Sequence, residues 1–480
     1  MKSLPVSAAL FSAMFVAGCM VGPDYQRPTA PVPPAFKELS GWKLSQPSDD
    51  ADKGAWWAIY HDPELDRLER MVEISNQTVK EYEAQYRNAV ALVAEARANL
   101  FPTVGLTGGV TRSAGHSSAA LGGGGKSGTE YSVTGTVSWD LDVWGRVRRQ
   151  VESSVAGVQV SAADLANPKL SAQATLATDY FDLRAEDALT QLLHETTDAY
   201  RHALQITENQ YHAGTTSNAD VVTARAQLQS TEAQLVGVGV QRQQYEHAIA
   251  MLTGHAPAEL TIAPAPLAIA VPVVPPGLPS ELLERRPDIA AAERQMQAEN
   301  ALIGVQVAAF YPSISLSALG GLAGNPLAQL FNISNNVWSL GASASETVFS
   351  GGARSAAVAA ARATYDQSVA SYRQTVLTGF QQVEDALSSL RILEQQAAAE
   401  AIAVDSARRA VDITLNEYRA GTVAYTSVIT EQTLLLADRQ AALSVQQSRL
   451  VASVALIEAL GGGWSSAALP DQVPMAVPLE

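Results

Sequence analysis

The sequence has little charge, few aromatic residues and a single cysteine. Charged residues make up 17% of its 480 residues, against about 25% in typical soluble domains. Aromatic residues contribute 6%, although 47% of the chain is hydrophobic, so the apolar content comes largely from Ala, Val and Leu. A net charge of −16 excludes nucleic acid as a partner, because phosphate binding needs a concentrated basic face. One cysteine excludes a disulfide framework, a cysteine-based zinc site and an iron–sulfur cluster.

Catalytic motifs are missing as well. The seven histidines form no HExxH motif, the sequence has no GxSxG motif, and Cys19 has no partner set for nucleophilic catalysis. The methionines are scattered, which does not support a thioether copper relay. We therefore expect a protein that is not an enzyme and that has no cofactor and no metal site.

The cysteine itself follows a short apolar segment. Lys2 supplies one positive charge, residues 4–17 are uncharged and too few to span a bilayer, and small residues precede Cys19. This arrangement resembles the lipobox of bacterial lipoproteins. The resemblance implies that residues 1–18 are a signal peptide and that Cys19 carries the lipid, with Met20 favouring the outer membrane. The alternative is a buried structural cysteine.

A long internal repeat organises the chain. Tyr-His-Ala-Gly-Thr recurs as Tyr-Arg-Ala-Gly-Thr, which places Gly214 and Gly421 at an offset of 207 positions. Such self-similarity predicts two copies of one long unit instead of several unrelated domains. The predicted parts are an N-terminal segment at 19–60, a first repeat at 61–254, a proline-rich linker at 255–279, a second repeat at 280–464 and a tail at 465–480.

Four segments alternate apolar and small polar residues, which predicts β-strands. They span about residues 103–112, 130–140, 312–321 and 337–346. The polar partners are hydroxyl residues and glycines, and aromatic residues cluster at the strand ends, as expected of a wall between lipid and a water-filled lumen. A half-buried sheet in a soluble protein is the alternative. Because an open barrel needs more than about eight strands, four per chain favour a trimer.

Two segments of helical composition are unusually long. Residues 145–213 are interrupted only at Asn167-Pro168, and residues 354–420 contain no proline. At about 1.5 Å per residue, each would reach roughly 100 Å. Apolar residues recur every seven positions in the segments that follow, which predicts left-handed coiled-coil packing. An ordinary coiled-coil hairpin would explain these helices but not the strands.

Several ordered blocks resemble the outer membrane factor family, the TolC-like exit ducts of tripartite efflux pumps. The blocks are residues 19–28, 56–57 with 62–63, 139–148, 278–289 and 349–352, and the resemblance covers about residues 19–464. It implies a membrane α/β barrel: a homotrimer whose twelve-stranded outer membrane β-barrel continues into a periplasmic α-helical barrel. The implied partners are a periplasmic adaptor protein, an inner membrane pump and outer membrane lipid.

The tips of the two repeats, at about 211–218 and 418–426, are by this resemblance the periplasmic entrance. It implies that the adaptor contacts the tip residues, which are Gly214, Thr215, Gly421 and Thr422. Family members hold the closed state through a tyrosine and an aspartate, and Tyr418 and Asp220 match these two positions. The alternative is a surface tyrosine and a helix-capping aspartate.

The sequence departs from the family at the gate. An arginine and luminal aspartates of the family are replaced by Val423, Ser427 and Thr430. Thr426 and Thr430 share a helix face, so we expect a hydroxyl ring with weaker cation binding and a looser latch.

The expected function is a passive outer membrane duct for drugs or other small toxic compounds. It would belong to a tripartite, proton-driven efflux system and would be opened by its adaptor. An exit channel for type I protein secretion is one alternative. A lipid-anchored periplasmic coiled-coil scaffold is another.

Overall fold

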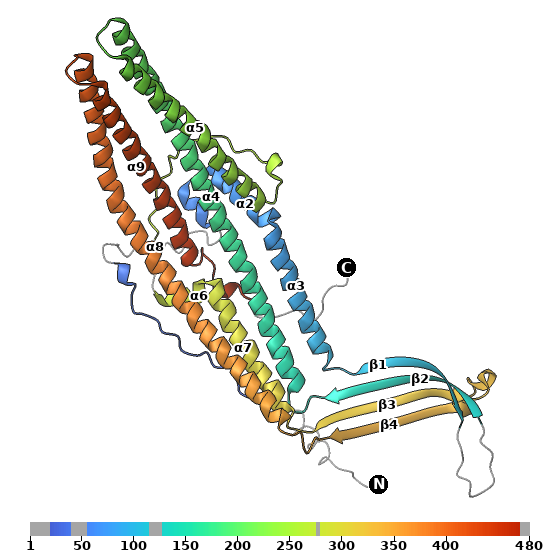
Figure 1. The fold of residues 1–480 in the computed structure, drawn as a ribbon. Coiled ribbons are helices and arrows are strands. Elements are labelled where there is room, and N and C mark those ends of the chain that lie inside the picture. The colour runs from blue at the N-terminus through green and yellow to red at the C-terminus, as the bar shows by residue number, and fades with distance from the viewer. Residues whose placement is uncertain (1–19, 40–54, 115–126, 275–278, 471–480) are drawn as a thin grey trace.

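The computed structural model describes residues 20–39, 55–114, 127–274 and 279–470 (Figure 1). The signal peptide predicted at 1–18 and Cys19 lie outside these residues. Long helices form one arm of the molecule, and a sheet extends from one end of it (Figure 1).

Helices of matching length confirm the internal repeat. In chain order they are α2 (Pro63–Ser75), α3 (Gln77–Ala98), α4 (Arg146–His212), α5 (Asn218–Leu252), α6 (Leu282–Arg285), α7 (Pro287–Ala308), α8 (Ala353–Arg419) and α9 (Tyr425–Ala459). Both α4 and α8 have 67 residues, both α5 and α9 have 35, and both α3 and α7 have 22. Pro168 lies inside α4, which continues through it. No helix of the described residues is both long enough and apolar enough to cross a membrane.

The four predicted strands are present and form one antiparallel sheet. They are β1 (Thr103–Ala114), β2 (Ser127–Leu141), β3 (Ser313–Gly324) and β4 (Asn336–Ser345). Their order in the sheet is β1-β2-β3-β4, so the pairing of β2 with β3 joins the two repeats. Hydroxyl side chains bridge neighbouring strands, for example Ser315 and Ser343 at 2.7 Å. The fold class predicted from the sequence, long helices continuous with strands in two repeats, is confirmed.

In each repeat, the end of one shorter helix meets the start of another. The end of α5 meets the start of α3, and the end of α9 meets the start of α7. The side-chain amide of Asn76, which caps α3, donates to the carbonyl of Leu252 at the end of α5 (2.8 Å). In the second repeat the guanidinium of Arg286, just before α7, donates to the carbonyl of Ala459 at the end of α9 (2.8 Å). We call the second junction the α9–α7 joint. Such contacts satisfy carbonyls that a helix end leaves without a partner.

The N-terminal segments cover one side of the helices at mid-length. Phe36 packs edge-on against Phe380 of α8, and the Tyr180 hydroxyl of α4 donates to Asp62, the N-cap of α2. The largest cluster of buried apolar residues lies here, where η2 (Trp56–Tyr60) and α2 meet α4, α8 and α9. The chain thus has a thick middle, with slender hairpin tips at one end and the sheet at the other (Figure 1).

The linker between the repeats is tied to the first repeat by buried charges. Asp187 of α4 accepts from Arg184 (3.0 Å), from Arg242 of α5 (2.7 Å) and from the backbone of Ala265 (3.0 Å). Glu246 accepts from Arg242 and from the backbone of Ile262. Because each carboxylate has several donors, the cost of burying these charges is offset.

Candidate functional site: the two hairpin tips

The first tip joins α4 to α5 through a tight left-handed turn. Gly214 has φ 75°, a conformation that costs a side-chain-bearing residue energy. The amides of Gly214 and Thr215 donate back to the carbonyls of Tyr211 and Gln210, both at 2.9 Å. The Thr215 hydroxyl also donates to the Gln210 carbonyl (3.0 Å). This Schellman arrangement closes the carboxyl end of α4.

The second tip repeats this backbone between α8 and α9. Gly421 has φ 76°, and the amides of Gly421 and Thr422 donate to Tyr418 and Glu417, both at 3.0 Å. The Thr422 hydroxyl donates to Glu417 (2.9 Å). The four residues predicted to contact an adaptor therefore occupy equivalent places at the far end of the helices (Figure 1).

Asp220 belongs to the first tip and lies in the first turn of α5. Its carboxylate accepts from the hydroxyls of Thr216 (2.7 Å) and Ser217 (2.8 Å) and from the Ser217 amide (3.2 Å). In return the Ser217 hydroxyl accepts from the Asp220 amide, which completes a capping box. The hydrogen bonds from Thr216 and then Ser217 lower the pKa of Asp220.

Tyr418 belongs to the second tip and is buried, not exposed on a helix surface. Its hydroxyl donates to the Thr207 hydroxyl of α4 at 3.4 Å, and its ring lies 5.2 Å from that of Tyr425. With Ala203, Ala224 and Val428 the two tyrosines form a small apolar cluster between the repeats. Burial, followed by the neighbouring Tyr418, raises the pKa of Tyr425 to about 12.

Asp220 and Tyr418 line one cavity of about 690 Å³ between the two tips. The two side chains form hydrogen bonds with different partners. The Asp220 carboxylate accepts from residues of its own turn, and the Tyr418 hydroxyl donates to Thr207. Among the hydrogen bonds of the described residues, none joins Asp220 to Tyr418 directly. The structure therefore places both residues at the tips and shows Asp220 in a capping box, while their role in a gate stays a prediction.

Thr426 and Thr430 lie on the first turns of α9 and are exposed. The Thr430 hydroxyl donates to the Thr426 carbonyl at 3.0 Å. Its proton is thus used within the helix, while its oxygen still has lone pairs that can face solvent. This geometry is compatible with a ring of neutral oxygens.

Sequence reasoning missed Tyr425 and Thr207. Tyr425 is the first residue of α9 and is almost completely buried, and Thr207 supplies the polar contact for Tyr418. A signal for Tyr425 was present, because Tyr425 and Val428 are three residues apart on one helix face. The position of Thr207 depends on the packing of α4 against α9, which no local pattern reports.

Comparisons with known proteins agree with this architecture. Residues 70–255 and 278–462 match the sequence model of the outer membrane efflux protein family, one segment for each repeat. The chain is 31% identical to the probable efflux pump outer membrane protein TtgC of Pseudomonas putida, over 94% of both chains. It is 29% identical to the cation efflux system protein CusC of Escherichia coli, over 96% of this chain and 99% of that one. The solved outer-membrane channel OprN covers 93% of this chain, and all of OprN is covered, with a TM-score of 0.86 and 29% identity.

Both repeats match the family, and the relatives are covered over nearly their whole length. The resemblance to the outer membrane factor family is thus confirmed, together with the expected role in efflux. Members of this family are outer membrane channels and not enzymes. The chain therefore belongs to the outer membrane efflux protein family and is the outer membrane channel component of a tripartite efflux system.

Proposed function

We propose that this chain acts as a homotrimeric, lipid-anchored exit duct for drugs or other small toxic compounds. An adaptor protein binds its tips and opens them, and an inner membrane pump driven by protons supplies the cargo. The duct itself is passive.

The observation that best supports a trimer is that the four-stranded sheet is open at both edges. Within the described residues, β1 and β4 each pair on one side only, which leaves two free edges. Free edges are usually covered or paired, because their backbone groups need hydrogen-bond partners. The edge strands also present apolar side chains, among them Leu106 (80% exposed) and Leu340 (76% exposed). Three copies joined β4 to β1 would close twelve strands with a lipid-facing exterior.

The entrance is proposed at the opposite end of the 67-residue helices. The paired turns at Gly214 and Gly421 present the same backbone shape twice in each chain. Three chains would present it six times around the entrance, a repeated surface that suits a periplasmic adaptor. Lipid attachment at Cys19 would hold the other end of the chain at the outer membrane.

Purified full-length protein tests the duct. We expect trimers that survive heating in detergent and liposomes that swell in small sugars when the protein is present. Monomers without permeability would instead support a periplasmic scaffold. Deletion of the gene should raise susceptibility to drugs, metals or aromatic acids. Loss of a secreted protein with unchanged susceptibility would favour type I secretion.

The lipid anchor has a separate test. Metabolic labelling with palmitate should mark the wild-type protein and leave Cys19→Ser unlabelled. Labelling of Cys19→Ser would contradict attachment at this cysteine. Swelling activity of Cys19→Ser distinguishes loss of the anchor from loss of the duct.

The hydroxyl ring is also proposed, with Thr426 and Thr430 facing the closed entrance. Neutral oxygens bind divalent cations less well than carboxylates do. Single-channel conductance should therefore be insensitive to millimolar Mg²⁺ in the wild type and become sensitive in Thr430→Asp. Closure of the wild type by millimolar Mg²⁺ would contradict the proposal.

A further inference from the structure

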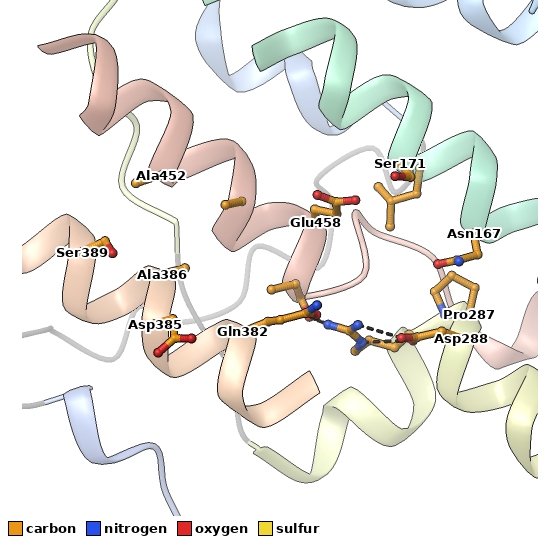
Figure 2. Close-up of a pocket in the computed structure, with 14 residues that line it drawn as sticks. Asn167, Ser171, Pro287, Asp288, Gln382, Asp385, Ala386, Ser389, Ala452 and Glu458 are labelled. Carbon is orange, nitrogen blue, oxygen red and sulfur yellow. Dashed lines mark hydrogen bonds and ion pairs between the residues drawn. The ribbon is translucent and has the colours of Figure 1, made fainter. Parts of the chain in front are cut away.

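A second cavity lies at the α9–α7 joint, far from the tips. Its volume is about 500 Å³, within the range of small-molecule sites. Four segments line it: α4, the start of α7, α8 and the end of α9. Figure 2 shows Ser171 of α4 beside Glu458 of α9, with Asp385 and Gln382 of α8 across the space.

This cavity opens on the side of the helices that the described N-terminal residues, 20–39 and 55–75, leave uncovered. On α9, Ser453 contacts the Tyr60 hydroxyl (2.7 Å), whereas Ala455 lines the cavity. Because an α-helix turns by about 100° per residue, Ser453 and Ala455 point in directions roughly 200° apart, on opposite sides of α9.

The other two helices repeat this arrangement. Tyr180 of α4 and Phe380 of α8 contact the covering segments, and Ser171 and Ser389 line the cavity. Each pair is separated by nine positions, or about 180° around its helix. All three helices therefore turn the cavity side away from the covered side. In the proposed trimer this uncovered face is the lumen.

Among the described residues that line the cavity, the one cation is already neutralised. The Arg286 guanidinium, which is buried, donates to both carboxylate oxygens of Asp288 (3.0 and 2.7 Å) and to the Ala459 carbonyl (Figure 2). Asp385 and Glu458 form no ion pair within the described residues. These two carboxylates give the described lining of the cavity a net negative charge, with no cation of that lining to match it.

Neutral residues form the remaining walls: small apolar ones, and the polar side chains of Asn167, Ser171, Gln382 and Ser389. Alanines supply much of this lining, with Leu170 and Pro287 beside them; the alanines are 386, 452, 455 and 459. Burial raises the pKa of the Glu458 carboxyl, and the Ser171 hydroxyl and the Arg286 charge act in the opposite direction. A carboxylate at the edge of an apolar wall favours a ligand with a cationic group and an apolar body.

Acidic residues continue from this cavity along the same face of α4. Asp179, Asp182 and Glu186 lie about one helical turn apart, beyond Ser171. Burial and the neighbouring Asp182 raise the pKa of Asp179 to about 6. The electrostatic potential along this face would attract cations toward the cavity.

We propose that the cavity at the α9–α7 joint binds small organic cations, with Asp385 and Glu458 neutralising the charge and the alanine walls holding the apolar part. Its placement in the lumen rests on the proposed function, whereas binding to the chain does not. The channel then has a resting site for cationic cargo at mid-length, one in each protomer.

Ethidium, a fluorescent organic cation, tests this proposal on the full-length protein in phosphatidylcholine nanodiscs. We expect saturable binding of one ethidium per chain, and at least tenfold weaker binding by the double variant Asp385→Asn/Glu458→Gln. Ala455→Trp, which fills the cavity and keeps both carboxylates, should weaken binding to a similar extent. Asp412→Asn, an exposed carboxylate of α8 remote from the cavity, is the matched control and should bind as the wild type does.

Two outcomes would overturn the proposal: equal ethidium affinity in the double variant and the wild type, or equal binding of an anionic dye such as anilinonaphthalene sulfonate. Acidification from pH 8 to pH 5 should weaken ethidium binding by the wild type, because burial raises the pKa of Glu458 and its carboxylate therefore gains protons sooner than an exposed one as the pH falls. Liposome swelling with neutral sugars should be the same for all variants. If the wild-type protein causes no swelling, the proposed duct is wrong. If it causes swelling but does not bind ethidium, only the proposed cation site is wrong.

Discussion

The two tips share one backbone but begin their second helices differently. Both turns place glycine at nearly the same φ, 75° and 76°, and both close with the same two backbone hydrogen bonds. In the first tip, Ser217 and Asp220 form a capping box for α5. In the second, Ala424 occupies the N-cap of α9, no side chain caps the helix, and Tyr425 is buried beside it.

The first tip is stabilised by hydrogen bonds within its own turn, whereas the second is held by contacts with the first repeat. The capping box satisfies the first amides of α5 within four residues, so the first tip keeps its shape without its neighbour. The second tip depends on contact with the first repeat, through the Tyr418–Thr207 hydrogen bond and the tyrosine cluster. A movement that separates the repeats would therefore loosen the second tip more than the first.

Truncating Tyr425 should have the largest effect on this comparison. Tyr425→Ala removes a buried ring and should destabilise the second tip by about 3 kcal/mol, near the lower end for buried aromatic residues. Hydrogen exchange at the amides of α9 measures the loss, and the first tip should change little. Tyr211→Ala, at a residue 43% exposed, is the control and should cost under about 0.5 kcal/mol. Equal losses at both tips would remove the distinction.

The glycines test what the tips share. Gly214→Ala and Gly421→Ala each force a side-chain-bearing residue into the left-handed region, at a cost of about 1.5 kcal/mol. An added Cβ has no heavy atom within 4 Å at either position, so strain is the whole effect and should be equal. Hydrogen exchange at each tip should give matching losses. A clearly larger loss of stability in Gly421→Ala would mean that the contacts of the second tip with the first repeat also stabilise its turn.

Exchanging the caps should narrow the difference. Ser217→Ala removes the cap of α5 and should cost about 1 kcal/mol. The double substitution Ala424→Ser/Ser427→Asp introduces the Ser217 and Asp220 pair at the equivalent positions of the second tip. It should protect the first amides of α9 from exchange by a similar amount. No added protection would show that the packing of Tyr425 prevents the cap from forming.

The smallest expected effect is a loss of stability at the start of α5 when the pH falls and Asp220 is protonated. The hydrogen bonds from Thr216 and Ser217 hold the pKa of Asp220 below its unfolded value, so their stabilisation is present above the unfolded pKa and is lost as pH falls through the folded pKa. Exchange at the start of α5 should therefore rise below about pH 4, after correction for intrinsic exchange. Asp220→Asn should remove this dependence, and α9 should show none of it in either protein. The same acid response in α9 would contradict the assignment to Asp220.

Much of the fold could be predicted because its signals are local and repeated. Period-two alternation located the strands to within a few residues, although β1 and β2 extend further into the segment between them than expected. Helical composition gave α4 and α8 almost to their ends. The tip glycines and threonines were also found, since a Schellman turn is built from neighbouring residues.

The site was less predictable where it depends on distant contacts. The hydrogen-bond partners of Asp220 and Tyr418 were not predicted, and Thr207 lies 211 positions before Tyr418. Glu69 gives the same lesson in α2. It is fully buried against other elements, its carboxylate oxygens have no hydrogen-bond partner in the part of the chain that the structure describes, and burial raises its pKa well above the usual value.

The sequence by itself determined the repeat, the strands, the long helices and the turns, because each follows from periodicity or from the conformational limits of a few adjacent residues. Only the tertiary structure decided which faces are covered. The N-terminal residues that the structure describes occupy one side of α4, α8 and α9 at mid-length and leave the acidic side open. Burial depends on what packs against a helix as well as on the helix's own pattern. Five of the 48 acidic residues lie on this open face, which runs from the α9–α7 joint along α4.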